Sequence, residues 1–294
     1  MSLRIPFDPL NPGQYFACCG LFELANQLWP GIEACFDGLE FCLSGASQLD
    51  ELLDLVGRCQ IGNTMTADDL ARFERFEVMP GADRKKISGG EEDFKQLTKQ
   101  MREFPLVFRW SVDDAAESHE LLVDWFADNY AGGSRFKTWA GQQGVLTIAR
   151  SMRSALSDPV WRTERCLSYS VSGCGLPFNF DSNLGGQGGA VDLGFSFDPL
   201  AASSLTKIET TARPVLELLA MIGLQRFRPA QVERSNRFVY TAWTQPLPIS
   251  IAAPAASGFM PTPNPSTYEF RLLYRTKYLK SFLPAVPYNG DADE

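Results

Sequence analysis

Basic and aromatic residues alternate in three clusters of the second half of the chain, and both residue types suit contacts to nucleic acid. The clusters are Arg135-Phe-Lys-Thr-Trp139, Gln225-Arg-Phe-Arg228 and Tyr268–Lys280. Arginine binds a phosphate through two parallel hydrogen bonds, lysine adds a point charge, and aromatic rings stack on bases whatever their sequence. Each cluster alone also fits a solvated surface with packed aromatics. Three in one half of the chain favour a nucleic-acid surface.

The candidate contact residues carry a cation, an aromatic ring or a side-chain amide. They are Arg135, Lys137, Trp139, Gln142, Gln143, Arg226, Arg228, Arg271, Tyr274, Arg275, Lys277 and Lys280. Two of them, Arg271 and Arg275, are four positions apart, so they share one face if this segment is a strand.

Formal charge is divided between the two halves of the sequence. Residues 1–130 hold 11 Lys and Arg against 23 Asp and Glu, whereas residues 131–290 hold 16 against 9. The net charges are therefore −12 and +7, and the three acids among the last four residues complete the overall −8. Such a division predicts a polyanion on the basic side and a different partner on the acidic side.

Catalytic chemistry has little support in the sequence. His119 is the only histidine, and the helix expected at 119–129 would place it on a surface. Most early acids stand at expected helix starts, where they suit the helix dipole. The seven cysteines form no Cys-x-x-Cys pair, so we expect reduced thiols that mostly fill the core. We expect no catalytic residue, no metal site and no cofactor.

A glycine-rich segment, Gly185-Gly-Gln-Gly-Gly189, resembles a phosphate loop only superficially. It lacks the Lys-Ser/Thr pair of a P-loop and precedes an expected strand at 191–197 instead of a helix. We expect a flexible loop that touches a partner's backbone.

Hydrophobic periodicity and turn residues predict an α+β fold with antiparallel strands, an N-terminal β-α-β-β unit, a helical middle and a β-rich C-terminal half. The opening unit is a strand near Leu3–Phe7, a helix from Pro12 to Trp29, and a hairpin around Asp37-Gly38. Further helices are expected at 48–58, 67–75, 91–103, 119–129, 141–156 and 214–224. Further strands are expected at 106–112, 167–171, 237–244, 247–252 and 268–275.

The sequence suggests two regions that meet at Ala131-Gly-Gly-Ser134. Residues 1–130 form an acidic α/β region suited to subunit docking, and residues 131–294 form a basic α+β region suited to nucleic acid. We expect a cytoplasmic protein, because there is neither a signal-peptide pattern nor an apolar run long enough for a bilayer.

Five ordered segments resemble the small effector subunit of type I-U (now I-G) CRISPR systems, and the resemblance spans nearly the whole chain. They are Asn11–Ala25, Phe136–Gln143, Ala190–Ser196, Ile222–Pro229 and Phe270–Pro284. That family is similar to a reduced Cascade large subunit. The resemblance implies a non-catalytic part in antiviral defence.

The partners that the resemblance implies are the backbone subunits of a crRNA-guided ribonucleoprotein complex, the crRNA, target double-stranded DNA with its protospacer-adjacent motif, and a recruited helicase-nuclease. Guide pairing reads sequence there, while protein reads a short motif and backbone shape. Three alternatives stay open: a structural adaptor that binds only protein, a role like the helical small subunit that supports the backbone, and a metal-dependent nuclease.

Overall fold

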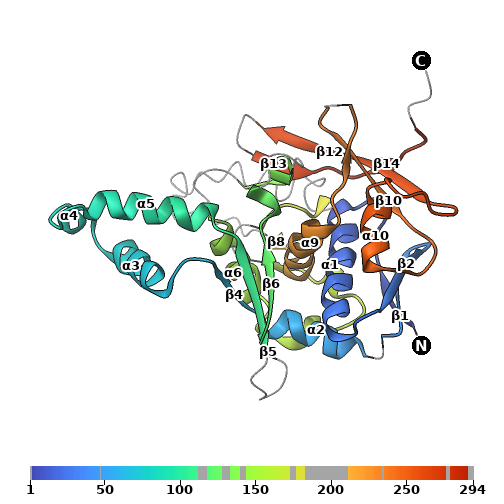
Figure 1. Cartoon of the computed structure of the whole chain (residues 1–294), viewed down its shortest axis with the longest axis horizontal. Helices are drawn as coiled ribbons and strands as arrows, with labels where there is room; N and C mark the ends of the chain where they lie inside the picture. The colour runs from blue at the N-terminus through green and yellow to red at the C-terminus, as the bar shows by residue number, and fades with distance from the viewer. Residues whose placement is uncertain are drawn as a thin grey trace.

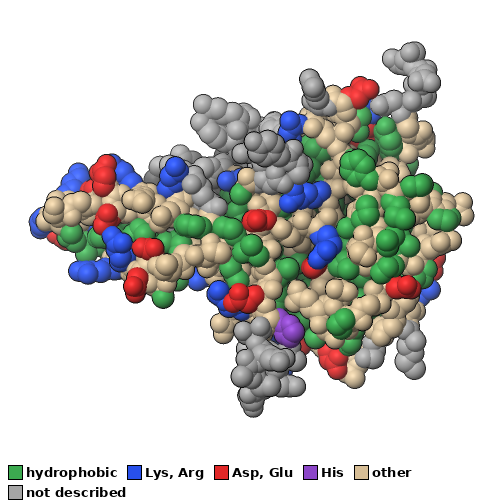
Figure 2. Space-filling view, in the orientation of Figure 1, with side chains coloured by type: hydrophobic (Ala, Val, Ile, Leu, Met, Phe, Trp, Pro, Cys, Tyr) green, Lys and Arg blue, Asp and Glu red, His purple; other side chains and the backbone are tan. Residues whose placement is uncertain are grey.

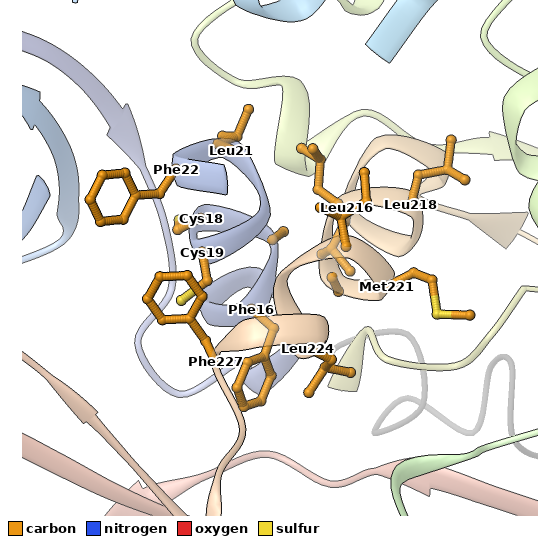
Figure 3. Close-up of a cluster of buried hydrophobic side chains, with 14 of the residues drawn as sticks. Phe16, Cys18, Cys19, Leu21, Phe22, Leu216, Leu218, Met221, Leu224 and Phe227 are labelled. Carbon is orange, nitrogen blue, oxygen red and sulfur yellow. The ribbon is translucent and has the colours of Figure 1, made fainter. Parts of the chain in front are cut away.

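Two buried helices, α1 (Pro12–Leu28) and α9 (Pro214–Arg226), pack against each other at the centre of the computed structural model (Figure 1). Every residue from Pro12 to Ala25 is buried, as is every residue from Pro214 to Leu224. Figure 3 shows apolar side chains projecting from both helices on several sides. A helix that is apolar all round must be covered all round, so the other elements surround this pair. The structure describes residues 2–46, 48–111, 118–127, 133–139, 144–172, 177–182, 211–233, 235–275 and 279–290.

Two glycines let the backbones of α1 and α9 touch. A Cβ atom added at Gly20 would lie 2.0 Å from the carbonyl oxygen of Leu219, and one added at Gly223 would lie 2.0 Å from that of Phe16. Real Cβ atoms do not approach a backbone oxygen this closely. The distance between the helices is therefore set by two positions that tolerate no side chain.

Four antiparallel strands cover one side of α1, in the order β1-β3-β2-β11. They are β1 (Ser2–Pro6), β2 (Glu33–Asp37), β3 (Glu40–Ser44) and β11 (Leu247–Pro248). The expected hairpin is present, with Gly38 at a φ of +60° in its turn. The strand–helix–strand–strand opening is confirmed, and Asn11 caps the helix by accepting hydrogen bonds from the backbone N–H groups of Gly13 and Gln14.

A second antiparallel sheet, in the order β13-β12-β10-β9 with β14 also beside β12, comes entirely from the C-terminal half. Its strands are β9 (Ala230–Gln231), β10 (Arg237–Ala242), β12 (Ser266–Arg275), β13 (Leu279–Phe282) and β14 (Val286–Pro287). Aromatic rings join it to α1, because Tyr15 and Tyr240 stack with ring centroids 4.3 Å apart. The hydroxyl of Tyr15 also donates to the carbonyl of Thr241 at 2.7 Å.

The remaining strands and helices complete the α+β fold that the sequence predicts. The strands are β4 (Gln60–Asn63), β5 (Leu106–Ser111) and β6 (Ser118–Val123), in one sheet, and the pair β7 (Val171–Ser172) and β8 (Thr211–Ala212). The helices are α2 (Leu49–Arg58), α3 (Ala67–Val78), α4 (Gly81–Arg84), α5 (Gly90–Glu103), α6 (Val145–Ser154) and α10 (Ile249–Ala256). Short 3₁₀ turns lie at Trp125–Ala127, Gly133–Phe136, Pro159–Trp161 and Cys166–Ser168. No helix within these described ranges is long and apolar enough to cross a bilayer.

Helices α3, α4 and α5 form an arm that projects from the body (Figure 1). The arm has its own small core, in which Phe73, Phe76 and Leu97 are buried and Phe94 packs against them. Arg84 fastens the turn between the helices, since its guanidinium donates to the carbonyls of Phe76 and Met79 at 2.7 Å each.

The two charge halves of the sequence share one hydrophobic core in the described residues. Helix α1 packs on α9, and β11 pairs with β2. Arginines of the basic half also bind the acidic half: Arg150 donates to the carbonyl of Ile61, Arg153 donates to that of Cys59, and Arg162 pairs with Asp54. The change in the sign of the net charge near residue 131 therefore does not mark a boundary between two separately packed cores.

Several expected elements differ from the structure. The described part of the helix expected at 119–129 forms strand β6 and the 3₁₀ turn Trp125–Ala127, because β6 pairs along its whole length with β5 and places His119 opposite Trp110. The expected strand at 247–252 is mostly helix α10, since periodicity does not distinguish a short apolar run of strand from one of helix. The expected strand at 167–171 starts in the 3₁₀ turn Cys166–Ser168 and is strand only at Val171. The glycine loop at 185–189, the strand expected at 191–197 and Cys174 lie outside the described residues.

A buried polar cluster ties the start of α1 to the start of α9. The Asn11 amide donates to Asp181 at 2.8 Å, and Arg213 lies 3.2 Å from the same carboxylate. The Glu217 carboxylate accepts hydrogen bonds from the backbone N–H groups of Phe180 and Asp181. Burial nevertheless raises the pKa of Glu217 to about 8, and the neighbouring Asp181 adds to this shift.

We expect Gly20→Ala and Gly223→Ala each to destabilise the fold by at least about 2 kcal/mol, because the new methyl group would overlap a backbone carbonyl of the facing helix. Urea unfolding measures the loss. Gly81→Ala is the matched control, since a Cβ atom there meets only the end of the Arg84 side chain, at 3.5 Å. Losses no larger than that of the control would contradict the close approach of the helices.

We expect stability to fall as the pH rises from about 5 to about 8, through the buried carboxyl of Glu217. An unfolded chain loses this proton near pH 4.5 and the folded chain near 8, so the folded state holds the extra proton between these values. The raised pKa therefore contributes no penalty below about pH 4.5 and a full penalty above about pH 8, on the order of 2–4 kcal/mol.

Glu217→Gln tests this, because the amide stays neutral. The difference between the urea unfolding midpoints at about pH 5 and about pH 8.5 should be smaller in this variant than in the wild type. Glu74→Gln, which changes an exposed acid of the arm, should keep the wild-type difference. An unchanged pH dependence in Glu217→Gln would show that this carboxyl is not responsible.

Candidate nucleic-acid interface

In the first basic-aromatic cluster, the ring of Trp139 is part of the core. Trp139 is only 4% exposed and packs on Trp125, Phe126 and Phe178, with ring centroids 5.2 to 6.0 Å away. A ring packed in this way offers no free face to a base. The ammonium of Lys137 lies 5.5 Å from the centre of the Trp139 ring. In this cluster the exposed cation is Arg135, whereas Gln142 and Gln143 lie outside the described residues.

The second cluster follows the end of α9, and Arg226 has a structural partner there. Its Nε and Nη2 donate to the two carboxylate oxygens of Glu23 at 2.6 and 3.0 Å. The Glu23 side chain is 7% exposed and that of Arg226 is 45% exposed. This pair raises the pKa of Arg226. Arg226 therefore neutralises a buried acid on α1 while part of its guanidinium stays accessible.

Gln225, beside Arg226, also holds the fold together. Its side-chain oxygen accepts hydrogen bonds from the backbone N–H groups of Asp124 and Trp125 at 2.9 and 3.1 Å, and its amide nitrogen donates to the Asp124 carboxylate. Arg228, two residues beyond Arg226, is half-buried.

The third cluster lies on β12 and β13, and the predicted strand at 268–275 is confirmed. The register places Tyr274 opposite Lys280 and Arg275 opposite Leu279. Lys277 lies outside the described residues. We call this pair of strands the cationic edge of the C-terminal sheet; positions 271 and 275 share one of its faces, and positions 274 and 280 share the other.

Two arginines share one carboxylate at the start of this edge. Arg237 and Arg271 are directly opposite each other on β10 and β12. Glu269 is 8% exposed, with Arg237 at 2.5 Å and Arg271 at 3.5 Å. These guanidinium groups, chiefly that of Arg237, lower the pKa of Glu269. The Arg271 side chain is 60% exposed, so its cation stays accessible to solvent on this face of the sheet although Glu269 lies nearby.

An open cleft of about 570 Å³ lies between the end of α9 and the end of α10. The α9 side supplies Arg226, Arg228, Pro229, Ala230 and Gln231, and the α10 side supplies Ala253, Pro254, Ser257 and Phe259. The structure thus adds Gln231 and Phe259 to the second cluster. The sequence held a weak signal for Phe259, an aromatic residue just after a glycine in a Pro-rich stretch, but no pattern linked it to Arg226.

The described thiols are poorly suited to nucleophilic chemistry. All six described cysteines are buried, and burial raises the pKa of Cys59 to about 11 and that of Cys166 to about 12. Buried thiols of this kind stay protonated and inert. His119 is exposed on β6. Among the described residues no group of three or more His, Cys, Asp or Glu side chains could hold a metal ion.

Positive and negative side chains are mixed on the face shown in Figure 2. Lys and Arg side chains lie both on the arm and on the body, with acids between them. Comparison with protein-family models, with curated proteins and with solved structures finds no match.

We expect Arg226→Ala to lower stability by about 1–3 kcal/mol, because it leaves the buried Glu23 carboxylate unpaired. The range is below that of a fully buried pair because the Arg226 side chain is partly solvated. Urea unfolding should also show that Glu23→Gln restores much of the loss in the double variant, since it removes the orphaned charge. Arg271→Ala is the control and should change stability by less than about 0.5 kcal/mol, because Glu269 keeps Arg237. A lack of rescue would contradict the pairing.

Proposed function

We propose that this chain is a non-catalytic subunit of a CRISPR type I crRNA-guided interference complex, in which its C-terminal sheet contacts nucleic acid and its acidic surfaces contact basic partner subunits. The five sequence segments that resemble the small effector subunit of type I-U systems motivate the choice of complex. The observation that carries the nucleic-acid role is the accessible guanidinium of Arg271 on β12, whose side chain is 60% exposed although it lies 3.5 Å from Glu269.

The cationic edge is suited to the phosphate backbone more than to base edges. Arg271 is exposed at the start of the edge, and β13 places Lys280 beside Tyr274 at its end. Phosphate contacts position a protein on a nucleic acid without reading its sequence, which agrees with a complex whose specificity comes from guide pairing. Target double-stranded DNA, including the motif beside the protospacer, is the ligand that we assign to this edge.

A non-catalytic role is supported by the chemistry of the described residues. The thiols are buried and hold their protons, and the lone imidazole stands on an exposed strand opposite Trp110. Cleavage is therefore assigned to a recruited helicase-nuclease, and this chain supplies binding and assembly.

A purely protein-binding adaptor is the second candidate, and the arm of α3, α4 and α5 favours it. The arm projects from the body, and Val78 at the end of α3 is 83% exposed. An exposed apolar side chain on a projecting element is typical of a protein contact. This role and nucleic-acid binding use different surfaces, so one experiment can separate them.

The test replaces Arg271, Arg275, Lys277 and Lys280 together by Ala in the assembled complex. We expect affinity for target duplex to fall by roughly tenfold or more. The dependence of log K on log salt should also flatten, by about one unit for each phosphate that the variant no longer neutralises. Gel-shift titrations at several salt concentrations measure both quantities.

The matched control replaces Lys85, Lys86, Lys95 and Lys99 of the arm by Ala, which removes the same charge elsewhere. We expect this variant to bind duplex like the wild type. Unchanged duplex affinity in the sheet variant, with the complex intact, would contradict the assignment of this edge. Equal losses in both variants would show that net charge and not the sheet is responsible. Absence of the wild-type chain from any guide-containing complex would overturn the proposed function itself.

A further inference from the structure

The cleft between α9 and α10 has cations on its α9 side and apolar residues on both sides. Arg226 and Arg228 stand on the α9 side, and none of its described lining residues is acidic. Pro229 and Ala230 add apolar surface on the α9 side, and Pro254 adds it on the α10 side. A volume of about 570 Å³ lies in the range of sites that hold one small molecule or one unit of a polymer.

Arg226 is held in place at this wall. Two of its guanidinium nitrogens, Nε and Nη2, donate to the buried carboxylate of Glu23. Its Nη1 takes no part in that pair. An arginine anchored from behind loses little conformational freedom when it binds an anion, so its remaining donors are pre-organised for a phosphate.

Phe259 stands on the other side of the cleft and is 85% exposed. The turn that carries it is hydrogen-bonded, since the backbone N–H of Phe259 donates to the carbonyl of Pro254 at 3.1 Å and that of Gly258 donates to Ala255 at 3.0 Å. Gly258 has a φ of +75°, a conformation that a side chain would disfavour. The fold therefore holds a large aromatic ring in solvent beside two arginines.

We propose that this cleft binds one unpaired nucleotide of a single-stranded nucleic acid, with the base stacked on Phe259 and its phosphate on Arg226 and Arg228. An aromatic platform beside cations is the arrangement that binds single strands without sequence preference. A duplex would not fit this use, because both faces of each base are already stacked. The inference deepens the proposed function and rests on it only for the source of the strand, which is the guide or the displaced DNA.

The test uses the full chain with labelled oligothymidine and oligouridine, and with versions that carry 5-iodouracil for photocrosslinking. We expect the crosslinked peptide to contain Phe259, and Phe259→Ala to weaken binding of the single strand by roughly 5- to 100-fold, as loss of one base stack implies. Phe259→Tyr should keep the affinity. Met260→Ala removes the neighbouring exposed apolar side chain and should also leave binding unchanged.

The relative affinities for oligothymidine and oligouridine identify which single strand the cleft binds. Tighter binding of oligouridine supports the guide, because the 2′-hydroxyl distinguishes RNA from DNA, and equal or tighter binding of oligothymidine supports the displaced strand. The inference is overturned if Phe259→Ala weakens binding no more than Met260→Ala, or if no crosslink reaches Phe259. The isolated chain is sufficient for this test, so its result does not depend on whether the chain joins a CRISPR complex.

Discussion

The direct backbone contact between α1 and α9 is the constraint on which the rest of the structure depends. Gly20 and Gly223 allow two buried, mostly apolar helices to approach until each glycine lies against a backbone carbonyl of the facing helix, and the other elements cover that pair. The N-terminal sheet covers one side and the C-terminal sheet another. The approach also brings Glu23 of α1 to Arg226 of α9, which fixes one wall of the cleft. The geometry of the candidate site therefore derives from a contact in the core.

Charge in this protein has two different uses, and the sequence alone does not separate them. Arg150, Arg153 and Arg162 contribute to the positive count of the second half, yet they bind carbonyls or a carboxylate of the first half. Arg226 likewise pairs with the buried carboxylate of Glu23 on α1. Arg271, by contrast, is 60% exposed, so only part of the net charge of +7 counted in the sequence lies on the surface.

The sequence predicted the elements whose signals are local. The cap at Asn11, the hairpin around Asp37-Gly38 and the long strand β12 all depend on nearby residues, and all are present. The prediction from sequence was wrong where the secondary structure depends on pairing with a distant segment. Residues of β6, for example, form a strand because they pair with β5. The same limit applied to the site. Whether Trp139 is buried and whether Phe259 lies near Arg226 depends on contacts with residues more than ten positions away along the chain, which no local pattern encodes.

The order of the central helices along the chain has a consequence for biosynthesis. Helix α1 leaves the ribosome first, but its partner α9 begins at Pro214, about 200 residues later. At a synthesis rate of about 5–20 residues per second, the mostly apolar helix α1 lacks the surface that buries it for on the order of 10–40 s. The nascent chain must shelter α1 during that interval, either against its own early strands or on a chaperone. The distance along the chain between the two helices therefore decides how long this apolar surface stays uncovered during synthesis.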